Sequence, residues 1–286
     1  MKKRNTLFII FLLWLPGSLV WAQDSTGMPG DNFSLEGALE LFKKSDSPEA
    51  FEKMLNAADG KVNNLDLNED GETDYIRVID KQQDDVHAFV LQAVVSENES
   101  QDVAVIEIEK NGDGQADVQI IGDEDLYGEQ TIVEPHEEVK SNAGTQVSNV
   151  NVNVWAWPAV RYVYAPGYRV WVSPWGWRAR PMWWHPWRPL RYHVYHPYWT
   201  PYRHRYVVVH VHRTVRAHRI YAPVRTTSVI VHTRHRVAVD RYRASVHAGN
   251  PHAVQGNRTT AVQKTRTSRP VKRGRATKRS SRSGSH

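Results

Sequence analysis

The stretch "DVAVIEIE" (102–109) decides the fold class, because it has the composition and the two-residue period of a β-strand. One set of alternate positions holds Val103, Val105, Glu107 and Glu109, and the other holds Ala104, Ile106 and Ile108. A second β-rich stretch, "HAFVLQAVV" (87–95), precedes it after a short polar connection. We therefore expect the two stretches to form neighbouring antiparallel strands.

Further strand-like runs extend the predicted sheet on both sides. They lie near 62–67, 74–80 and 116–121, so that together with strands at 86–95 and 102–109 they make a five-stranded antiparallel meander. Short polar connections between the runs favour hairpins over crossover connections.

Two short amphipathic helices are predicted before the strands. The stretches "SLEGALELFKKS" (34–45) and "SPEAFEKMLNAADG" (47–60) repeat apolar residues at helical spacing, with Ser34 and Ser47 as N-caps. Gly60 suits the end of the second helix. We expect an α+β domain in which both helices cover one face of the sheet.

The net charge of +6 hides a strong asymmetry along the chain. Residues 23–138 contain 30 of the 31 acidic residues and seven Lys or Arg, a net charge of −23. Residues 139–286 contain 27 Lys or Arg and one acid, Asp240, a net charge of +26. This asymmetry predicts a basic arm that binds polyanions, and it also predicts pairing between the acidic and basic parts of the same chain.

Composition divides the chain into six segments. They are a signal peptide at 1–22, an acidic α+β domain at 32–135, a linker at 136–147, a Trp/Tyr/Pro/Arg-rich segment at 148–206, a Val/His/Arg-rich segment at 207–255 and a basic disordered tail at 256–286. Proline recurs too often in the aromatic segment for long helices or central strands. We expect a largely irregular or disordered basic aromatic arm, with strand-like parts only at 147–154 and within 207–247.

The N-terminal residues have the layout of a secretory signal peptide. Three basic residues precede a short apolar run, and Val20 and Ala22 occupy the small-residue positions of a cleavage site. We expect export to the periplasm, the outer envelope surface or the medium; an uncleaved membrane anchor is the alternative, which the short run disfavours.

The chain has no cysteine, which excludes disulfides, thiolate metal sites and a lipid-modified N-terminal cysteine.

Two acidic stretches, "DLNEDGETDYIRV" (66–78) and "EKNGDGQADVQII" (109–121), have a spacing that suits Ca²⁺, which takes about six to eight oxygen ligands. The candidate ligands are Asp66, Asn68, Asp70, the carbonyl of Glu72 and Asp74 in the first loop, and Glu109, Asn111, Asp113, the carbonyl of Gln115 and Asp117 in the second. Neither loop is an EF-hand, because Arg77 or Ile120 stands where that motif needs glutamate. An acidic hairpin turn without metal is the alternative.

The spacing of these loops resembles the D-x-[DN]-x-D-G-x-x-D loops between strands in FG-GAP repeats of integrin-type propellers. The resemblance covers about a dozen residues at each loop, and it implies that Asp74 and Asp117 complete the calcium shell. Glu109 departs from the usual first-position aspartate. Two copies are too few for a propeller, so the resemblance implies the loop alone.

Histidines are concentrated in the basic part, where twelve of the fourteen follow residue 139. His210 and His212 would present two imidazoles on one strand face, but the surrounding sequence offers arginines and no carboxylate to orient them, which disfavours catalytic zinc. Binding of copper, zinc or nickel by composition alone is an alternative function. The other alternative is a structural role, in which the histidines pack as polar aromatic side chains.

The aromatic segment, in which nine of the eleven Trp lie between Trp155 and Trp199, combines indoles with arginines. This combination predicts binding to an anionic envelope surface such as lipid headgroups, lipopolysaccharide or another polyanion, with nucleic acid as a less favoured partner. Packing of these aromatics within the chain is the simpler alternative.

No motif for nucleophilic catalysis, phosphate binding or a zinc hydrolase is present, and no small-molecule substrate is evident. We expect a non-enzymatic envelope protein; the alternatives are a metal-handling protein and a hydrolase that uses carboxylates of the acidic domain. The blocks "LDLNEDGETDYIRV" and "QDVAVIEIEK", followed by the aromatic arm, resemble a group of uncharacterised exported bacterial envelope proteins. That resemblance implies export and the same division of the chain.

Overall fold

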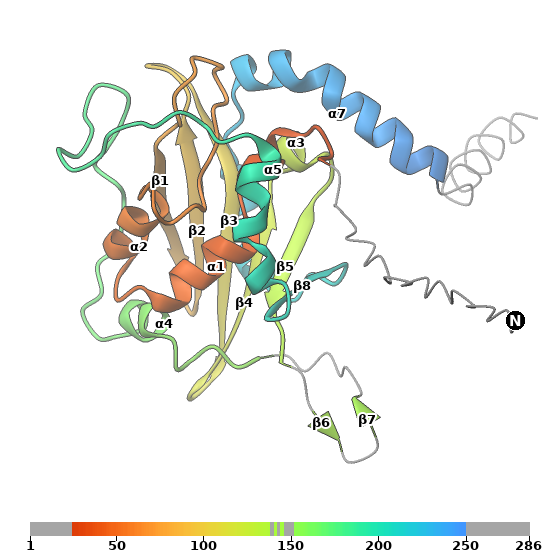
Figure 1. Cartoon of the computed structure of the whole chain (residues 1–286). Coiled ribbons are helices and arrows are strands. Elements are labelled where there is room, and N and C mark those ends of the chain that lie inside the picture. Colours follow the sequence, from red (N-terminus) through yellow and green to blue (C-terminus); the bar gives the residue numbers. More distant parts are fainter. Residues whose placement is uncertain (1–24, 138–139, 142–143, 146–151, 250–286) are drawn as a thin grey trace, which may run out of the picture.

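The computed structural model describes residues 25–137, 140–141, 144–145 and 152–249, and it has the predicted α+β class. Six strands form one antiparallel sheet in the order β1-β2-β3-β4-β5-β8 (Figure 1). The bounds are β1 (Ile76–Gln83), β2 (Val86–Val94), β3 (Ser100–Gly112), β4 (Gln115–Gly122), β5 (Thr131–Pro135) and β8 (Tyr206–Val209). A separate ribbon pairs β6 (Lys140–Ser141) with β7 (Gly144–Thr145).

The first two helices, α1 (Leu35–Lys44) and α2 (Pro48–Leu55), cover one face of the sheet (Figure 1). Both begin where the sequence predicts: Ser34 Oγ accepts the N–H of Gly37 at 3.0 Å, and Ser47 Oγ accepts the N–H of Ala50 at 3.1 Å. The core between helices and sheet includes Leu39, Phe42, Phe51, Leu55, Phe89, Leu91 and Ile106.

The second helix ends at Leu55, before the predicted stop at Gly60. The side chain of Asn56 follows it and brackets strand β1, because Nδ2 donates to the carbonyl of Ile76 at 2.6 Å and Oδ1 accepts its N–H at 2.8 Å. The chain therefore leaves the helix at the point where it is tied to the sheet.

The predicted strand at 62–67 is wrong, since this segment is a loop with one isolated bridge pair at Asn63. Side-chain amides take over the hydrogen bonds that a sheet would supply. Asn63 Nδ2 donates to the carbonyl of Asp74 at 2.7 Å, and Asn64 exchanges two hydrogen bonds with the backbone of Leu190 at 2.7 and 2.9 Å. The apolar side chains of the loop are buried without a strand.

Strand β3 contains a bulge that strict alternation does not predict. The register of β2 against β3 shifts so that Leu91 pairs with Ala104 while Gln92 pairs with Asp102. Val103 and Ala104 consequently both join the core beneath the helices instead of lying on opposite faces.

The expectation of a disordered arm is wrong for residues 152–249, whereas the expected irregular structure is present in residues 164–191, which form isolated bridge pairs but no helix or longer strand. The described arm supplies β8, which pairs with β5, and it supplies α4 (Pro158–Val163), α5 (Tyr192–Tyr195), α6 (Val215–Tyr221) and α7 (Val229–Gly249). Its side chains enter the main core at Val154, Trp157, Tyr195, Trp199 and Tyr206. The acidic domain and the arm share one sheet and one core.

Short helical turns complete the described part of the chain. They are α3 (Glu124–Tyr127) and the 3₁₀ helices Pro29–Asn32, His196–Tyr198, Thr200–Tyr202 and Ala222–Val224. None of the helices within the described residues is both long and apolar enough to cross a bilayer. The predicted signal peptide, the predicted tail at 256–286 and most of the predicted strand at 147–154 lie outside the described residues.

The strand-like structure expected within 207–247 is present only at the start of that range, in β8, and helices follow. In α7, Val231 and Val239 are buried and His235 and Tyr242 are half-buried, so the inward face repeats at helical spacing. Alternating Val, His and Arg hide this stripe in the sequence.

The outer face of the sheet, opposite α1 and α2, is covered by α6. The apolar cluster between α6 and the sheet is small and contains Ala88, Val90, Val105, Ile121, Ile132 and Tyr221. The middle of the sheet is therefore buried on both faces.

Buried carboxylates of the first part of the chain contact donors from the arm at many points. The carboxylates are Glu40, Glu52, Asp80, Asp102, Glu107, Glu109, Asp123 and Glu134. Glu40 contacts Arg205 and Tyr206, Glu52 contacts Ser173 and Trp171, and Asp80 contacts Tyr168. Asp102 contacts Tyr221 and Thr226, and Glu107 contacts His212, Thr214 and His218. Glu109 contacts Arg216 and Ala217, Asp123 contacts Arg225, and Glu134 contacts Arg213. A buried carboxylate without such partners would be strongly destabilising.

We predict that Arg225→Met lowers the free energy of unfolding by about 3–5 kcal/mol, because it leaves Asp123 buried without its cation. Arg225 Nη2 lies 2.8 Å from Asp123 Oδ1, and burial raises the pKa of Asp123 to about 6 even beside the guanidinium. A raised pKa in the folded state means that stability is lost as the pH rises through that value. Urea unfolding should therefore show a larger loss at pH 8 than at pH 5.

The matched control is Arg219→Met, which changes an exposed arginine of α6. It should alter the free energy of unfolding by no more than about 0.5 kcal/mol. Equal losses for the two variants would contradict the role given to the Asp123–Arg225 pair.

Candidate metal centre

Three side chains on the outer face of the sheet form the histidine–carboxylate centre: Glu107, His212 and His218. In the described part of the chain, this is the group of His and acidic residues whose ligand atoms all lie within 4.8 Å of one another. Glu107 comes from the middle of β3, His212 from the segment after β8, and His218 from α6. Both parts of the chain therefore contribute.

Each imidazole contacts a different oxygen of the carboxylate. His212 Nε2 lies 2.7 Å from Glu107 Oε2, and His218 Nδ1 lies 2.8 Å from Oε1. Thr214 Oγ1 donates to Oε2 at 2.7 Å. The Glu107 side chain is fully buried, whereas those of His212 and His218 are 20% and 28% exposed, so solvent reaches the centre from the imidazole side.

Gln119 fixes the backbone on both sides of His212. It is the cross-strand neighbour of Glu107 on β4. Its Nε2 donates to the carbonyl of Val211 at 2.9 Å, and its Oε1 accepts the N–H of Arg213 at 2.7 Å. A buried amide of the sheet thus determines where the His212 ring lies.

Glu109 fixes the helix that carries His218. Glu109 and Glu107 are two residues apart on the same face of β3, and the Glu109 carboxylate accepts the N–H groups of Arg216 and Ala217 at 2.6 and 3.1 Å. These donors belong to the first turn of α6, where a carboxylate is stabilising. The helix is therefore anchored in its first turn, at the two residues directly before His218.

Hydrogen bonding sets the charge of the centre. Burial alone would raise the pKa of Glu107, but the bonds from His212, His218 and Thr214 outweigh it and lower that pKa. The same bond to Glu107 raises the pKa of His218, against the opposing effect of burial. The carboxylate is therefore ionised at neutral pH.

The neighbouring arginines do not place unpaired positive charge at the centre. Arg213 Nε lies 3.0 Å from Glu134 Oε2, and Arg216 Nε lies 2.8 Å from Glu109 Oε2. The sequence suggests that these arginines would repel a metal cation. In the structure each of the two arginines is paired with a carboxylate, which offsets its charge. With both imidazoles neutral, Glu107 leaves one negative charge uncompensated.

Two imidazole nitrogens and a carboxylate are ligands for Zn²⁺, Cu²⁺ and Ni²⁺. A metal would need both imidazoles to present lone pairs, so its binding would displace the protons that now join the rings to Glu107. Thr214 would keep the carboxylate oriented. The arrangement can thus hold either protons or a metal ion.

Sequence reasoning identified one residue of this centre and missed two. It paired His212 with His210, but His210 is exposed and has no part in the centre, and the carboxylate comes from a strand more than a hundred residues earlier. The one local signal for Glu107 was an acidic residue between Ile106 and Ile108 in an apolar strand.

The first predicted calcium loop is a turn held by its own side chains. Asp66 accepts the N–H groups of Asp70 and Gly71 at 3.0 and 2.9 Å, and Asn68 Oδ1 also accepts the Asp70 N–H at 3.0 Å. Asp74 is buried and accepts the N–H of Leu67 at 2.6 Å. Within the described residues, Asp66, Asp70 and Asp74 do not form a trio of carboxylates within 4.8 Å.

The backbone of this loop also curls tightly around Asp70, whose Oδ1 accepts the N–H of Glu72 at 2.9 Å. The four predicted side-chain ligands thus lie in one turn, and calcium binding here stays a prediction.

The second predicted calcium loop is the hairpin turn between β3 and β4. Glu109 is turned away from it, toward α6, while Asp113 and Gln115 are exposed at the tip. Asn111 Nδ2 donates to Asp117 Oδ2 at 2.5 Å. The structure does not bring the five predicted ligands together, and we do not propose calcium there.

We predict that Asp74→Asn stabilises the protein at pH 8 and has a clearly smaller effect at pH 5. Burial, with Asp66 and Asp70 nearby, raises the pKa of Asp74 to about 7, so the wild type loses stability as the pH rises from about 4 to about 7. Asparagine resembles the protonated acid and escapes that loss. The measurement is the melting temperature at both pH values, with exposed Asp59→Asn as the control.

The same melting experiment tests the first calcium loop. If Ca²⁺ binds there, it should raise the melting temperature of the wild type at pH 8 by a few degrees and that of Asp74→Asn by less, since the cation stabilises the ionised Asp74. No calcium-dependent rise in the wild type would contradict calcium binding. An effect of Asp74→Asn that is independent of pH would contradict the raised pKa.

Comparison with protein-family models, curated proteins and solved structures gave no match for this chain, so its function has to be judged from the chemistry of these residues.

Proposed function

We propose that the protein is an exported, non-enzymatic envelope protein that binds a divalent transition-metal ion, copper, zinc or nickel, at the histidine–carboxylate centre. The observation that carries this proposal is the pair of contacts at 2.7 and 2.8 Å from His212 Nε2 and His218 Nδ1 to the two oxygens of Glu107. Export is proposed from the N-terminal sequence.

Charge supports a cation over a purely structural cluster. Two carboxylates beside the centre, Glu109 and Glu134, are each paired with an arginine, and Glu107 is paired only with imidazoles. A divalent ion would replace two protons shared with a buried carboxylate, and its charge would be attracted by that carboxylate in a partly desolvated site.

The ligand set favours copper among the three metals. Nitrogen and oxygen sites follow the Irving–Williams order, in which Cu²⁺ binds more tightly than Ni²⁺ and Zn²⁺. The absence of cysteine from the chain excludes the thiolate ligands that select Cu⁺. We therefore propose an oxidised, divalent ion.

The limited exposure of the centre supports a binding role over catalysis. Glu107 and Thr214 are buried, and solvent reaches only part of each imidazole. A substrate would have little of the metal to contact, whereas an ion needs only the nitrogen and oxygen atoms.

We predict that the full chain binds one Cu²⁺ with submillimolar or tighter affinity, and that Glu107→Gln and His218→Ala each weaken binding by at least about tenfold. Isothermal titration calorimetry in a weakly coordinating buffer measures both. Affinity should fall between pH 7.5 and pH 5.5, because protons compete for His218, whose pKa is raised by Glu107.

The matched control is His232→Ala, which removes an exposed histidine of α7 and should leave this affinity unchanged. Equal weakening by His232→Ala and His218→Ala would indicate binding by composition alone, which would contradict a defined centre.

Adhesion to a polyanionic surface is a second candidate function, favoured by the exposed face of α7. Arg234, Arg236 and Arg241 are exposed on this helix; Arg234 pairs with Glu69 at 3.2 Å and Arg236 with Asp240 at 3.6 Å, and both pairs lie in solvent. Helix α7 carries no Trp, and the exposed Trp177 and Trp183 (41% and 43%) lie elsewhere in the arm, so arginine charge rather than indole insertion would provide the attraction at this helix.

We predict that changing Arg234, Arg236 and Arg241 together to Gln weakens sedimentation of the full chain with phosphatidylglycerol vesicles at low salt. About 1 kcal/mol is expected for each arginine near an anionic surface. The control replaces three exposed arginines elsewhere in the arm, Arg161, Arg169 and Arg191. Equal weakening in both triple variants would contradict a specific role for α7.

A further inference from the structure

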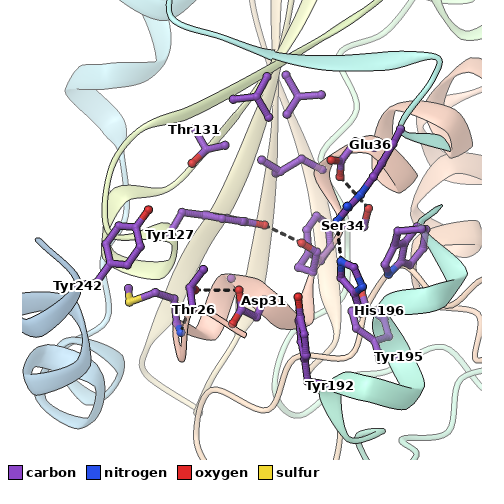
Figure 2. A pocket seen from close by; sticks show the side chains of 18 residues that line it. Thr26, Asp31, Ser34, Glu36, Tyr127, Thr131, Tyr192, Tyr195, His196 and Tyr242 are labelled. Carbon is purple, nitrogen blue, oxygen red and sulfur yellow. Dashed lines mark hydrogen bonds between the residues drawn. The ribbon is translucent and has the colours of Figure 1, made fainter. Parts of the chain in front are cut away.

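A cavity of about 230 Å³ lies on the helix-covered side of the sheet, opposite the histidine–carboxylate centre. Figure 2 shows Tyr127 and Tyr242 on one side of it and Tyr192 and His196 on the other, with Asp31 between them. Its walls come from both ends of the described chain, from the turn before α1 to α7. The cavity is smaller than the roughly 300–1,000 Å³ of drug-sized sites, so it suits a small ligand.

The walls are fixed by close packing. A Cβ on Gly30 would lie 2.6 Å from the ring of Tyr127, and one on Gly37 would lie 2.1 Å from the ring of Trp199, so each aromatic sits directly on a glycine. The Tyr127 hydroxyl donates to the carbonyl of Phe33 at 2.9 Å. The cavity is therefore preformed and does not depend on a ligand for its shape.

Two carboxylates supply negative charge to the cavity. Asp31 accepts hydrogen bonds from Ser25 Oγ at 2.7 Å and Thr26 Oγ1 at 2.8 Å. Glu36 accepts one from Ser34 Oγ at 3.0 Å. Both acids are half-exposed and oriented by neighbouring hydroxyls, so they can face a cation without losing their own positions.

A single arginine supplies positive charge at the rim. Arg203 is exposed, and one of its nitrogens lies 2.6 Å from His196 Nε2. Burial and the nearby Arg203 both lower the pKa of His196, which keeps the imidazole neutral at pH 7 and able to accept from the guanidinium. The remaining N–H groups of the guanidinium can form bidentate hydrogen bonds with an anion.

These groups match a ligand that carries both charges. Aromatic faces together with carboxylates attract an organic ammonium group, and an arginine at the rim suits a phosphate. We propose that the cavity binds a phosphate-linked organic amine, with its ammonium group among Tyr127, Tyr192, Tyr242, Asp31 and Glu36 and its phosphate at Arg203. Such a group occurs both as a phospholipid headgroup and as a soluble or polymer-linked phosphoamine.

The test titrates the full chain, with EDTA present, against phosphoethanolamine, ethanolamine and inorganic phosphate, with binding followed by NMR. Phosphoethanolamine should bind more tightly than either fragment. Tyr192→Leu and Asp31→Asn should each weaken both amines by roughly fivefold or more. Arg203→Gln should reduce phosphoethanolamine to the affinity of ethanolamine and leave ethanolamine unchanged.

Tyr198→Leu is the matched control, since Tyr198 is 48% exposed and does not line the cavity; it should change no affinity. Melting temperatures identify any variant that fails to fold, and the selectivity change in Arg203→Gln does not depend on stability. Sedimentation with phosphatidylethanolamine vesicles that Tyr192→Leu weakens would identify a lipid headgroup, and binding of phosphoethanolamine without such sedimentation would identify a soluble phosphoamine; either result supports the site.

Two results would overturn the proposal. One is no saturable binding of phosphoethanolamine by the wild type. The other is binding of phosphoethanolamine and inorganic phosphate with equal affinity, unaffected by Tyr192→Leu. Because EDTA removes metal ions throughout, neither result bears on the histidine–carboxylate centre.

Discussion

Buried negative charge is the constraint on which the rest of this structure depends. Carboxylates of the strands and first helices are taken out of water, and each stays there because the second part of the chain brings it a guanidinium, imidazole, hydroxyl or amide. Removing one partner from such a contact is costly, whereas an apolar replacement of both could be tolerated. The folded position of the arm is therefore determined residue by residue by the acids beneath it, in addition to the strand pairing of β5 with β8.

The sequence was sufficient where structure is decided by near neighbours. Ser34 and Ser47 cap the first two helices, and the β-rich runs at 87–95 and 102–109 pair as expected. It was insufficient where a distant residue decides: Asn64 makes its loop by binding Leu190, and the irregular, proline-rich arm is ordered by groups that lie far earlier in the chain. Composition suggested disorder for the arm because the partners of its polar side chains are not visible in the arm itself.

The same distinction separates the two kinds of candidate site. The calcium loops could be predicted because their candidate ligands are a few residues apart, and in the second loop one of these candidates, Glu109, is used to anchor α6. The histidine–carboxylate centre could not be found in that way, since Glu107 and the two histidines meet only after β3 and α6 have packed together. Glu107, flanked by Ile106 and Ile108, indicated locally that a buried acid needs a partner, but the local sequence did not identify that partner.

The late position of β8 in the chain has a consequence for biosynthesis. Until β8 emerges, β5 is the open edge of a nearly complete sheet, with Ile132 and Val133 and their unpaired backbone groups available to any other extended chain. The arm that closes this edge follows only after the whole tryptophan-rich segment has been made. A nascent chain that stalled or was cut between these strands would be prone to aggregate, so folding has to wait until most of the polypeptide is present.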